Sequence, residues 1–170
     1  MNDDLILVDL DDVEIGNGEK LWVHKNGKLH RAFSVFIIDG DRILLQRRNI
    51  HKYHSGGLWA NACCSHPRVG ETLKDAVKRR MLEEIGVNSN CEELFRFVYR
   101  TEYDNGLTEY EYDHVFLCKY SGEVYPSEEE IDEIRWVSIE ELKKDVIENP
   151  RNYASWFLIA LPRLLEIVVN

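Results

Sequence analysis

Short apolar-rich runs separated by Gly- and Asp-containing turns predict a series of β-strands along this chain. The turn at residues 39–41 separates two such runs. The turn at residues 104–106 separates two longer runs that we expect to pair as a hairpin. The expected strands cover residues 33–38, 43–47, 58–65, 94–103, 109–120 and 134–137.

Apolar residues spaced three and four positions apart predict a helix over residues 71–85, ended by Gly86. The apolar stripe of this helix consists of Leu73, Ala76, Val77, Met81 and Ile85. At about 100° per residue, Arg80 and Glu84 fall within the same stripe. Because a buried charge without a partner is costly, these two residues point to an ionic ligand or a metal nearby.

Two further helical patterns follow in the C-terminal part of the chain. Ser138 and Glu141 form a capping box for a helix that reaches about residue 148. Residues 153–169 are also helical in pattern, and Pro162 is expected to kink or divide that helix. Strands on both sides of one helix, with another helix behind them, favour an α/β sandwich with a mixed β-sheet flanked by helices. We expect a single domain over residues 1–170.

The net charge of −10 argues against a nucleic-acid partner, because phosphate backbones need a basic surface. It leaves room for a small anionic substrate, since basic side chains can still converge locally. The first residues lack the pattern of a signal or membrane segment, so we expect a cytoplasmic protein with no membrane contact. The four cysteines lack CxxC spacing and are expected to be reduced thiols. Monomer and homodimer both remain open.

The segment 61–67, Asn-Ala-Cys-Cys-Ser-His-Pro, is the most informative stretch of the chain. If it ends a strand, Cys64 and His66 point to one face while Cys63 and Ser65 point to the other. A thiol and an imidazole then lie side by side on one face of the strand. A lone strand cysteine is usually a small buried residue, which is the expectation for Cys63, Cys91 and Cys118. The neighbouring Ser-His-Pro favours a reactive role for Cys64.

Further candidate ligands come from two other parts of the chain. Glu109, Glu111 and Asp113 share one face of an expected strand. The Asn26-Gly27 pair is typical of a two-residue hairpin turn, which would place His24 and His30 on opposite faces. The two histidines can reach one metal only if a bulge or a wider loop intervenes, and we expect that geometry.

Several motifs in order give a family resemblance. A Nudix box placed on residues 65–87 finds Glu71, Arg79, Met81, Glu83, Glu84, Gly86 and Val87 at the expected positions. Ser65 replaces its leading Gly, and Arg80 replaces a Glu. With segment 61–67, segment 29–36 (Leu-His-Arg-Ala-Phe-Ser-Val-Phe) and the run 109–111 (Glu-Tyr-Glu), the chain resembles the type I isopentenyl diphosphate isomerases, Nudix-fold enzymes with a degenerate box. The resemblance extends from about Lys20 to Trp156.

The resemblance implies a role for each matching residue. A divalent metal, Mn²⁺, Mg²⁺ or Zn²⁺, is expected on His24, His30, His66, Glu109 and Glu111. A second ion, Mg²⁺, is expected on Glu84 together with the substrate diphosphate. The diphosphate is expected to contact Lys20, Arg48, Lys52 and Arg80. The catalytic residues are expected to be Cys64, Glu111, Tyr99 and Trp156.

The same residue types suit the chemistry that the resemblance implies. Isomerising isopentenyl to dimethylallyl diphosphate adds a proton to an alkene and removes another two carbons away, through a tertiary carbocation. This requires an acid and a base on opposite sides of the carbon skeleton, a dry cavity and an electron-rich ring. Cys64 and Glu111 are the expected acid–base pair, with the assignment open. Three imidazoles weight the metal site away from Mg²⁺ alone.

Two other functions remain open. A Nudix diphosphohydrolase of a nucleotide or prenyl diphosphate would use the same helix, although a cation at Arg80 discourages hydrolysis. A non-catalytic phosphate-binding module would need neither Cys64 nor Glu111.

Some residues also have simpler interpretations. His51, His54 and His114 are expected at the surface or in satisfied contacts, Trp156 alone fits an apolar helix face, and the acidic run 127–132 is expected to be a solvated loop.

Overall fold

Strand β3 (His30–Asp39) is the central strand of a mixed sheet in the computed structural model, which describes residues 3–169. It pairs in parallel with β8 and antiparallel with β1, β4 and β6. The other strands are β1 (Leu5–Val8), β2 (Glu14–Gly18), β4 (Arg42–Arg48), β5 (Trp59–Ala60), β6 (Cys63–Ser65), β7 (Cys91–Glu102), β8 (Thr108–Lys119) and β9 (Ile131–Ser138). The helices are α1 (Lys20–Lys25), α2 (Leu73–Ile85), α3 (Ile139–Glu148) and α4 (Ser155–Val168), with a short 3₁₀ helix at Pro150–Asn152.

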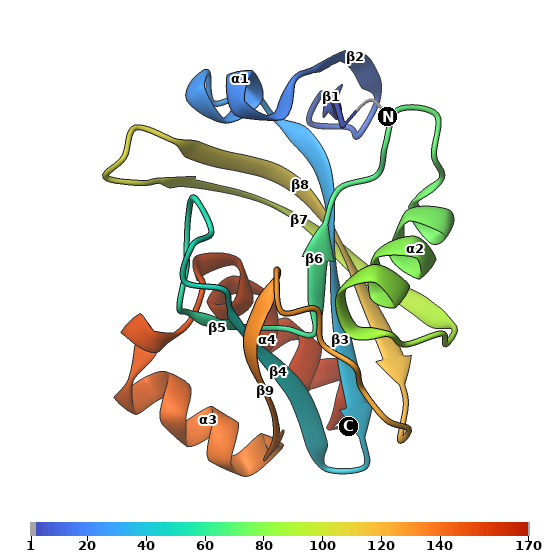
Figure 1. Cartoon of the computed structure of the whole chain (residues 1–170), viewed down its shortest axis with the longest axis vertical. Coiled ribbons are helices and arrows are strands. Elements are labelled where there is room, and N and C mark those ends of the chain that lie inside the picture. The colour runs from blue at the N-terminus through green and yellow to red at the C-terminus, as the bar shows by residue number, and fades with distance from the viewer. Residues whose placement is uncertain (1–2, 170) are drawn as a thin grey trace.

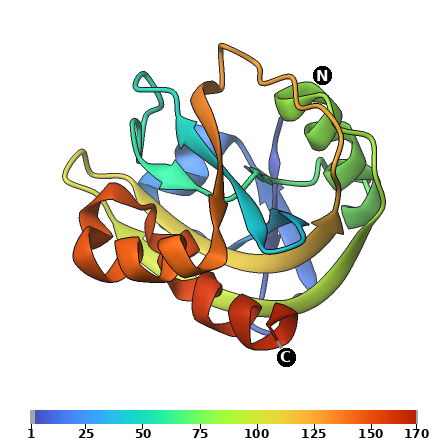
Figure 2. The ribbon, with the colours of Figure 1, turned by 90° about the horizontal axis from the view of Figure 1, so that it is seen from below.

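Helices cover both faces of the sheet, as Figures 1 and 2 show for α2 and α4. Alternation along β3 explains why both faces are apolar. Phe33, Val35 and Ile37 belong to the core on the α2 side, whereas Phe36 and Ile38 belong to the core on the α4 side. The α/β sandwich with a mixed sheet is therefore confirmed.

The helix signals of the sequence correspond closely to the structure. Helix α2 begins after Thr72, whose Oγ1 accepts the N–H of Asp75 at 3.1 Å, and it ends at Gly86, which has a φ of 65°. The capping box of Ser138 and Glu141 is present at the start of α3. Helix α4 runs through Pro162 without being divided. Among residues 3–169, none of the helices is long and apolar enough to cross a membrane.

The hairpin expected at Asn26-Gly27 is wrong, because residues 20–25 form helix α1. The side chain of Glu19 accepts the N–H groups of Leu21 and Trp22, at 2.8 and 2.9 Å, and so caps the first turn. Asn26 ends the helix, and its side-chain amide donates to the carbonyl of Trp22 at 2.8 Å. The histidines therefore converge through a helix followed by a turn, rather than through a bulged hairpin.

The expected strand over residues 58–65 is interrupted in its middle. Strand β5 pairs with β4, whereas β6 pairs with β3, and Asn61 and Ala62 connect them. The buried side-chain amide of Asn61 donates to the carbonyl of Val35 at 3.1 Å and to that of Cys63 at 2.9 Å. These bonds hold the connection against the central strand. The position of Cys64 is therefore fixed by this connection and by the pairing of β6 with β3.

Candidate active site

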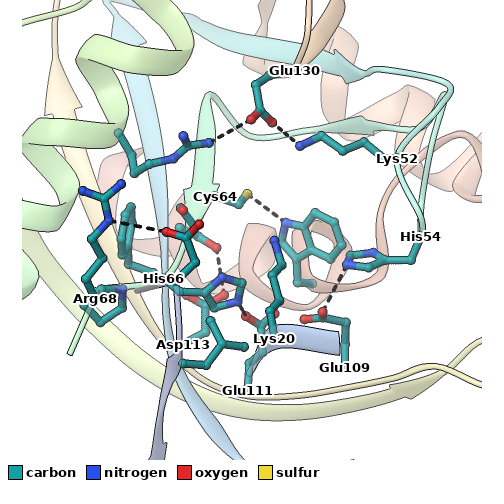
Figure 3. Close-up of a pocket in the computed structure, with 18 of the residues that line it drawn as sticks. Lys20, Lys52, His54, Cys64, His66, Arg68, Glu109, Glu111, Asp113 and Glu130 are labelled. Carbon is teal, nitrogen blue, oxygen red and sulfur yellow. Dashed lines mark hydrogen bonds and ion pairs between the residues drawn. The ribbon is translucent and has the colours of Figure 1, made fainter. Parts of the chain in front are cut away.

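A cavity of about 300 Å³ opens where α1, β6, β8, α2 and α4 meet. Most of the residues expected from the sequence line it. They are Lys20, Arg48, Lys52, Cys64, His66, Arg80, Glu109, Glu111 and Trp156. Figure 3 shows the labelled side chains pointing into this common space. His24, His30 and Tyr99 lie directly behind its wall, where they contact Glu109 and Glu111.

Four expected metal ligands form one cluster. His24, His30, His66 and Glu109 offer ligand atoms that all lie within 4.8 Å of one another. They come from α1, β3, the segment after β6, and β8. Glu111 lies beside the cluster, with Oε2 at 3.0 Å from Nε2 of His66 and 3.7 Å from Nε2 of His30. The parallel pairing of β3 with β8 sets His30 directly beside Glu111.

The backbone orients two of these imidazoles toward the centre of the cluster. Nδ1 of His24 donates to the carbonyl of Lys20 at 2.6 Å, and Nδ1 of His30 donates to that of Lys28 at 2.9 Å. Each ring then turns Nε2 toward the cluster, the atom by which a histidine held in this way binds a metal. Within residues 3–169, Nε2 of His30 is buried and has no hydrogen-bond partner. Such an orphaned acceptor fits a bound metal ion.

Burial favours the neutral, metal-binding form of two histidines. It lowers the pKa of His30 to about 4, and it holds the pKa of His66 well below its usual value. Burial also disfavours the charged form of His24, but the hydrogen bond to Glu109, the charge of Glu109 and the hydrogen bond to the Lys20 carbonyl together outweigh burial and raise the pKa.

The two carboxylates of β8 have opposite protonation tendencies. Burial, together with the charge of Glu109, raises the pKa of Glu111 well above its usual value. Burial also opposes ionisation of Glu109, yet hydrogen bonds from Glu111 and His24 hold its pKa well below the usual range. The Tyr99 hydroxyl donates to Glu111. The pair therefore retains one proton, which a nearby cation would help to release.

Cys64 lies in a polar contact with the indole of Trp156. Nε1 of Trp156 lies 3.2 Å from Sγ of Cys64 and 3.1 Å from Oδ1 of Asn61, and Figure 3 marks the contact of Cys64 with the indole. Burial raises the pKa of the Cys64 thiol to about 12, so it is protonated at neutral pH. Cys63 is fully buried in the core on the α2 side, which confirms the expected alternation of the two cysteines.

The four expected diphosphate contacts line the cavity, and two of them already contact carboxylates. Lys52 pairs with Glu130, and Arg80 lies 2.8 Å from Glu83, 3.0 Å from Glu84 and 3.3 Å from Glu130. Glu84 is 4% exposed, and among residues 3–169 it is not one of those that line the cavity. Its Oε2 is buried with no hydrogen-bond partner in residues 3–169, which leaves an acceptor for a cation.

Sequence reasoning missed two side chains of the site. His54 lies with Nε2 at 3.1 Å from Oε1 of Glu109, and only 8% of its side chain is exposed. It is thus a satisfied histidine, but one that contacts an expected metal ligand. Glu130 belongs to the acidic run expected to be a solvated loop, yet it faces Lys52 and Arg80. Neither lies in a periodic element, so only the folded chain reveals these contacts.

Comparison with known proteins gives a family match over most of the chain. The NUDIX domain family matches residues 28–157. Isopentenyl-diphosphate Delta-isomerase 2 of Aromatoleum aromaticum is 45% identical over 167 residues, which cover 98% of this chain and 88% of that protein. The isopentenyl-diphosphate Delta-isomerase of Burkholderia multivorans is 43% identical over 164 residues, with 96% of this chain and 93% of that protein covered.

Solved structures share the fold at lower identity. DR0079 from Deinococcus radiodurans superposes with a TM-score of 0.71 at 17% identity, covering 86% of this chain and 90% of that one. A MutT NUDIX hydrolase from Burkholderia pseudomallei gives a TM-score of 0.64 at 22% identity, covering 79% and 96%. These similarities show the fold alone, and they agree with a Nudix-like sandwich.

Proposed function

This chain belongs to the isopentenyl-diphosphate Delta-isomerases within the Nudix family, and we propose that it interconverts isopentenyl and dimethylallyl diphosphate in isoprenoid biosynthesis. The observation that supports this most is the position of Cys64, which shares one cavity with Glu111 and with His66 and Glu109 of the metal-type cluster. A thiol and a metal-type site that line one small cavity suit proton transfer to and from a bound hydrocarbon.

The histidine–glutamate cluster is proposed as the site of a divalent ion, held by His24, His30, His66, Glu109 and Glu111. Its three nitrogen donors favour Mn²⁺ or Zn²⁺ over Mg²⁺ alone. When bound, such an ion supplies positive charge that favours the ionised form of Glu111. A second ion, Mg²⁺, is proposed on Glu84 and the diphosphate, because Oε2 of Glu84 has no hydrogen-bond partner in the described part of the chain.

Two groups are proposed to move the protons. Cys64 and Glu111 lie on β6 and β8, the strands that flank β3, so a substrate between them meets one group on each side. Because the isomerisation is reversible, the group that donates in one direction accepts in the other. Tyr99 contacts Glu111 and orients its carboxyl group. The indole of Trp156 offers an electron-rich surface to the carbocation and a polar N–H to Sγ of Cys64.

The cationic side chains are proposed to bind the diphosphate. Lys20, Arg48, Lys52 and Arg80 line the same cavity and can neutralise several phosphate charges. Burial, with the charge of Lys52, lowers the pKa of Lys20, as expected for cations that gather where an anion binds. In a hydrolase, the position of Arg80 holds a metal-binding Glu. A cation there favours phosphate binding over the activation of water.

The proposed function is tested by incubating the pure protein with isopentenyl diphosphate, Mg²⁺ and Mn²⁺ and identifying the products. We expect dimethylallyl diphosphate to form, with no release of phosphate. Release of phosphate or pyrophosphate would identify a Nudix diphosphohydrolase, and binding without turnover would identify a phosphate-binding module. The cytoplasmic location, the lack of nucleic-acid partners, the single domain and the choice between monomer and homodimer stay predictions.

A further inference from the structure

Residues 49–58 form a loop that covers one side of the cavity and contributes Lys52, Tyr53 and His54 to its wall. Its base is fixed by hydrogen bonds to the start of β9 and to the residue before it. The backbone N–H of Asn49 donates to the carbonyl of Glu130 at 3.0 Å, and that of Ile50 donates to Oδ2 of Asp132 at 3.0 Å. The base of the loop therefore holds its place independently of the metal-type cluster.

The tip of the loop rests on the β7–β8 hairpin. The side-chain amide of Asn105 donates to the carbonyl of Tyr53 at 2.8 Å. The ring of His54 stacks on that of Tyr103 with centroids 5.0 Å apart, and it meets the rings of Tyr53 and Trp156 edge-on at 4.8 and 6.0 Å. These contacts leave His54 one orientation, with its edge toward Glu109 (Figure 3).

His54 and His24 hold the same carboxylate oxygen from two sides. Nε2 of His54 lies 3.1 Å from Oε1 of Glu109, and Nε2 of His24 contacts the same atom. An N–H on Nε2 of His54 donates to Glu109, which fixes the rotamer of a carboxylate that is 2% exposed. Partners that orient metal ligands in this way commonly change metal affinity by about 10–100-fold when they are removed.

We infer that His54 is a positioning residue that orients Glu109 for the divalent ion and fastens loop 49–58 over the cavity. The inference rests on the proposed metal site. Because one side chain makes both contacts, metal binding and loop closure favour each other, and this coupling is reciprocal. Lys52 lies on the same loop, so an occupied metal site also holds a proposed diphosphate contact in place.

Metal affinity measured without substrate tests the first part of the inference. We expect His54→Ala to raise the Kd for Mn²⁺ by about 10–100-fold. His54→Gln keeps an N–H donor at the end of its side chain, so it should stay within about threefold of the parent protein. His51→Ala, an exposed residue of the same loop, is the matched control and should bind Mn²⁺ like the parent protein.

Unchanged Mn²⁺ affinity in His54→Ala would overturn the inference. Equal losses in His54→Ala and His54→Gln would overturn it too, because the imidazole would then act as something other than a donor to Glu109. If His54→Ala does not fold, the comparison of His54→Gln with the parent protein still decides, since a loss well beyond threefold contradicts the donor role.

Hydrogen exchange of the loop tests the coupling. In the parent protein, Mn²⁺ should slow amide exchange beyond the base of the loop, across residues 51–58, and in His54→Ala this slowing should disappear. Slowing that persists in the variant would show that the loop closes independently of His54. These measurements need no turnover, so they can succeed even if the protein fails to isomerise isopentenyl diphosphate. They can likewise fail while isomerisation is observed.

Discussion

Cys64 owes its chemical character to three neighbours. Nε1 of Trp156 and Oδ1 of Asn61 contact its sulfur at 3.2 and 3.1 Å, and the Arg48 guanidinium lies 5.0 Å from the centre of the Trp156 ring. Burial favours the thiol, whereas the positive charge of Arg48 favours the thiolate. In the proposed mechanism, Cys64 holds a proton between turnovers and releases it to a bound substrate.

We expect Cys64→Ala to lower kcat by more than about tenfold, a loss of over about 1.4 kcal/mol, with little change in KM. The reason is that the role proposed for Cys64 is at the carbon skeleton and not at the diphosphate. Steady-state rates with isopentenyl diphosphate measure both constants. Cys63→Ala is the matched control, since Cys63 packs in the core on the α2 side, and its kcat should be near normal. A Cys64→Ala enzyme that keeps more than a tenth of the parent kcat would contradict this role.

Arg80 forms an ion pair with Glu84 and is also proposed to bind the diphosphate, and a substitution separates these two roles. Arg80→Ala should raise KM by a factor that corresponds to about 1.5–3 kcal/mol, the free energy of a charge-assisted hydrogen bond to the diphosphate. It should also lower the melting temperature, because the buried Glu84 loses its ion-pair partner at 3.0 Å. Arg80→Lys keeps the charge, so its KM and melting temperature should lie between those of the parent protein and those of Arg80→Ala. If Arg80→Ala melts earlier but keeps the parent KM, Arg80 is only the partner of Glu84.

At the scale of single residues, the sequence predicts the side chains that repeat or alternate. Cys64 and His66 follow from strand alternation, as do Glu109 and Glu111, and all four line the cavity. His54 and Glu130 follow from no pattern, because irregular loops bring them to the site. The local spacing around them contains no information about a contact with residue 109 or residue 80.

At the scale of elements, length decides what the sequence can predict. Helix α2 repeats its apolar spacing over 13 residues, so its pattern is unambiguous. Helix α1 has only six residues, and its start depends on the side chain of Glu19, a cap that short-range rules rarely favour. The Asn-Gly pair that follows α1 is typical of a hairpin, but here it ends a helix.

The cap of α3 gives an element-scale prediction that leaves the chemistry intact. Ser138→Ala removes the acceptor for the N–H of Glu141, at 3.1 Å in the capping box. It should lower the free energy of unfolding by about 0.5–2 kcal/mol. Helix α3 contributes no lining residue to the cavity among residues 3–169, so kcat and KM should be unchanged. Denaturant titration measures the first effect, and a variant as stable as the parent would contradict it.

At the scale of the whole molecule, the sheet order could not be read from the sequence. The parallel pairing of β3 with β8 joins strands that are distant in the chain, and β6 lies on the other side of β3. The sandwich architecture follows from the order of strands and helices, but strand neighbours depend on packing between distant segments. The metal-type cluster depends on that packing, since its members come from four separate segments.

Removal of divalent ions should affect both activity and stability. An ion that binds only the folded chain stabilises it by mass action. Exhaustive chelation is therefore expected to abolish isomerisation and to lower the melting temperature, and added Mn²⁺ should restore both. Enzyme assays and calorimetry with a chelator make the comparison. Full activity after chelation would argue against any metal at the cluster.

The metal-free protein should lose stability in acid through His30. Its pKa is about 4 in the fold, whereas in the unfolded chain it is about 6.5. The unfolded chain therefore takes up this proton first as the pH falls. The contribution is fully present above about pH 6.5 and is lost toward pH 4, by at most about 3 kcal/mol.

A variant isolates the contribution of His30 to this loss. His24 acts in the opposite direction, because Glu109 raises its pKa. Denaturant titrations of the parent protein and of His30→Asn from pH 7.5 to 4.5 give the free energy of unfolding of each. The contribution of His24 is common to both proteins and cancels in the difference. The variant should show a flatter pH dependence, and equal slopes would contradict the assignment.

The pairing of His30 with Glu111 also sets an order of events during synthesis. A nascent chain that ends before residue 108 contains all three histidines of the cluster but lacks both Glu109 and Glu111. The cluster is completed only when β8 has been made and has docked beside β3, a contact of high sequence separation that forms late in folding. An ion at the cluster should therefore slow unfolding while the folding rate stays nearly unchanged, so it stabilises the folded protein kinetically.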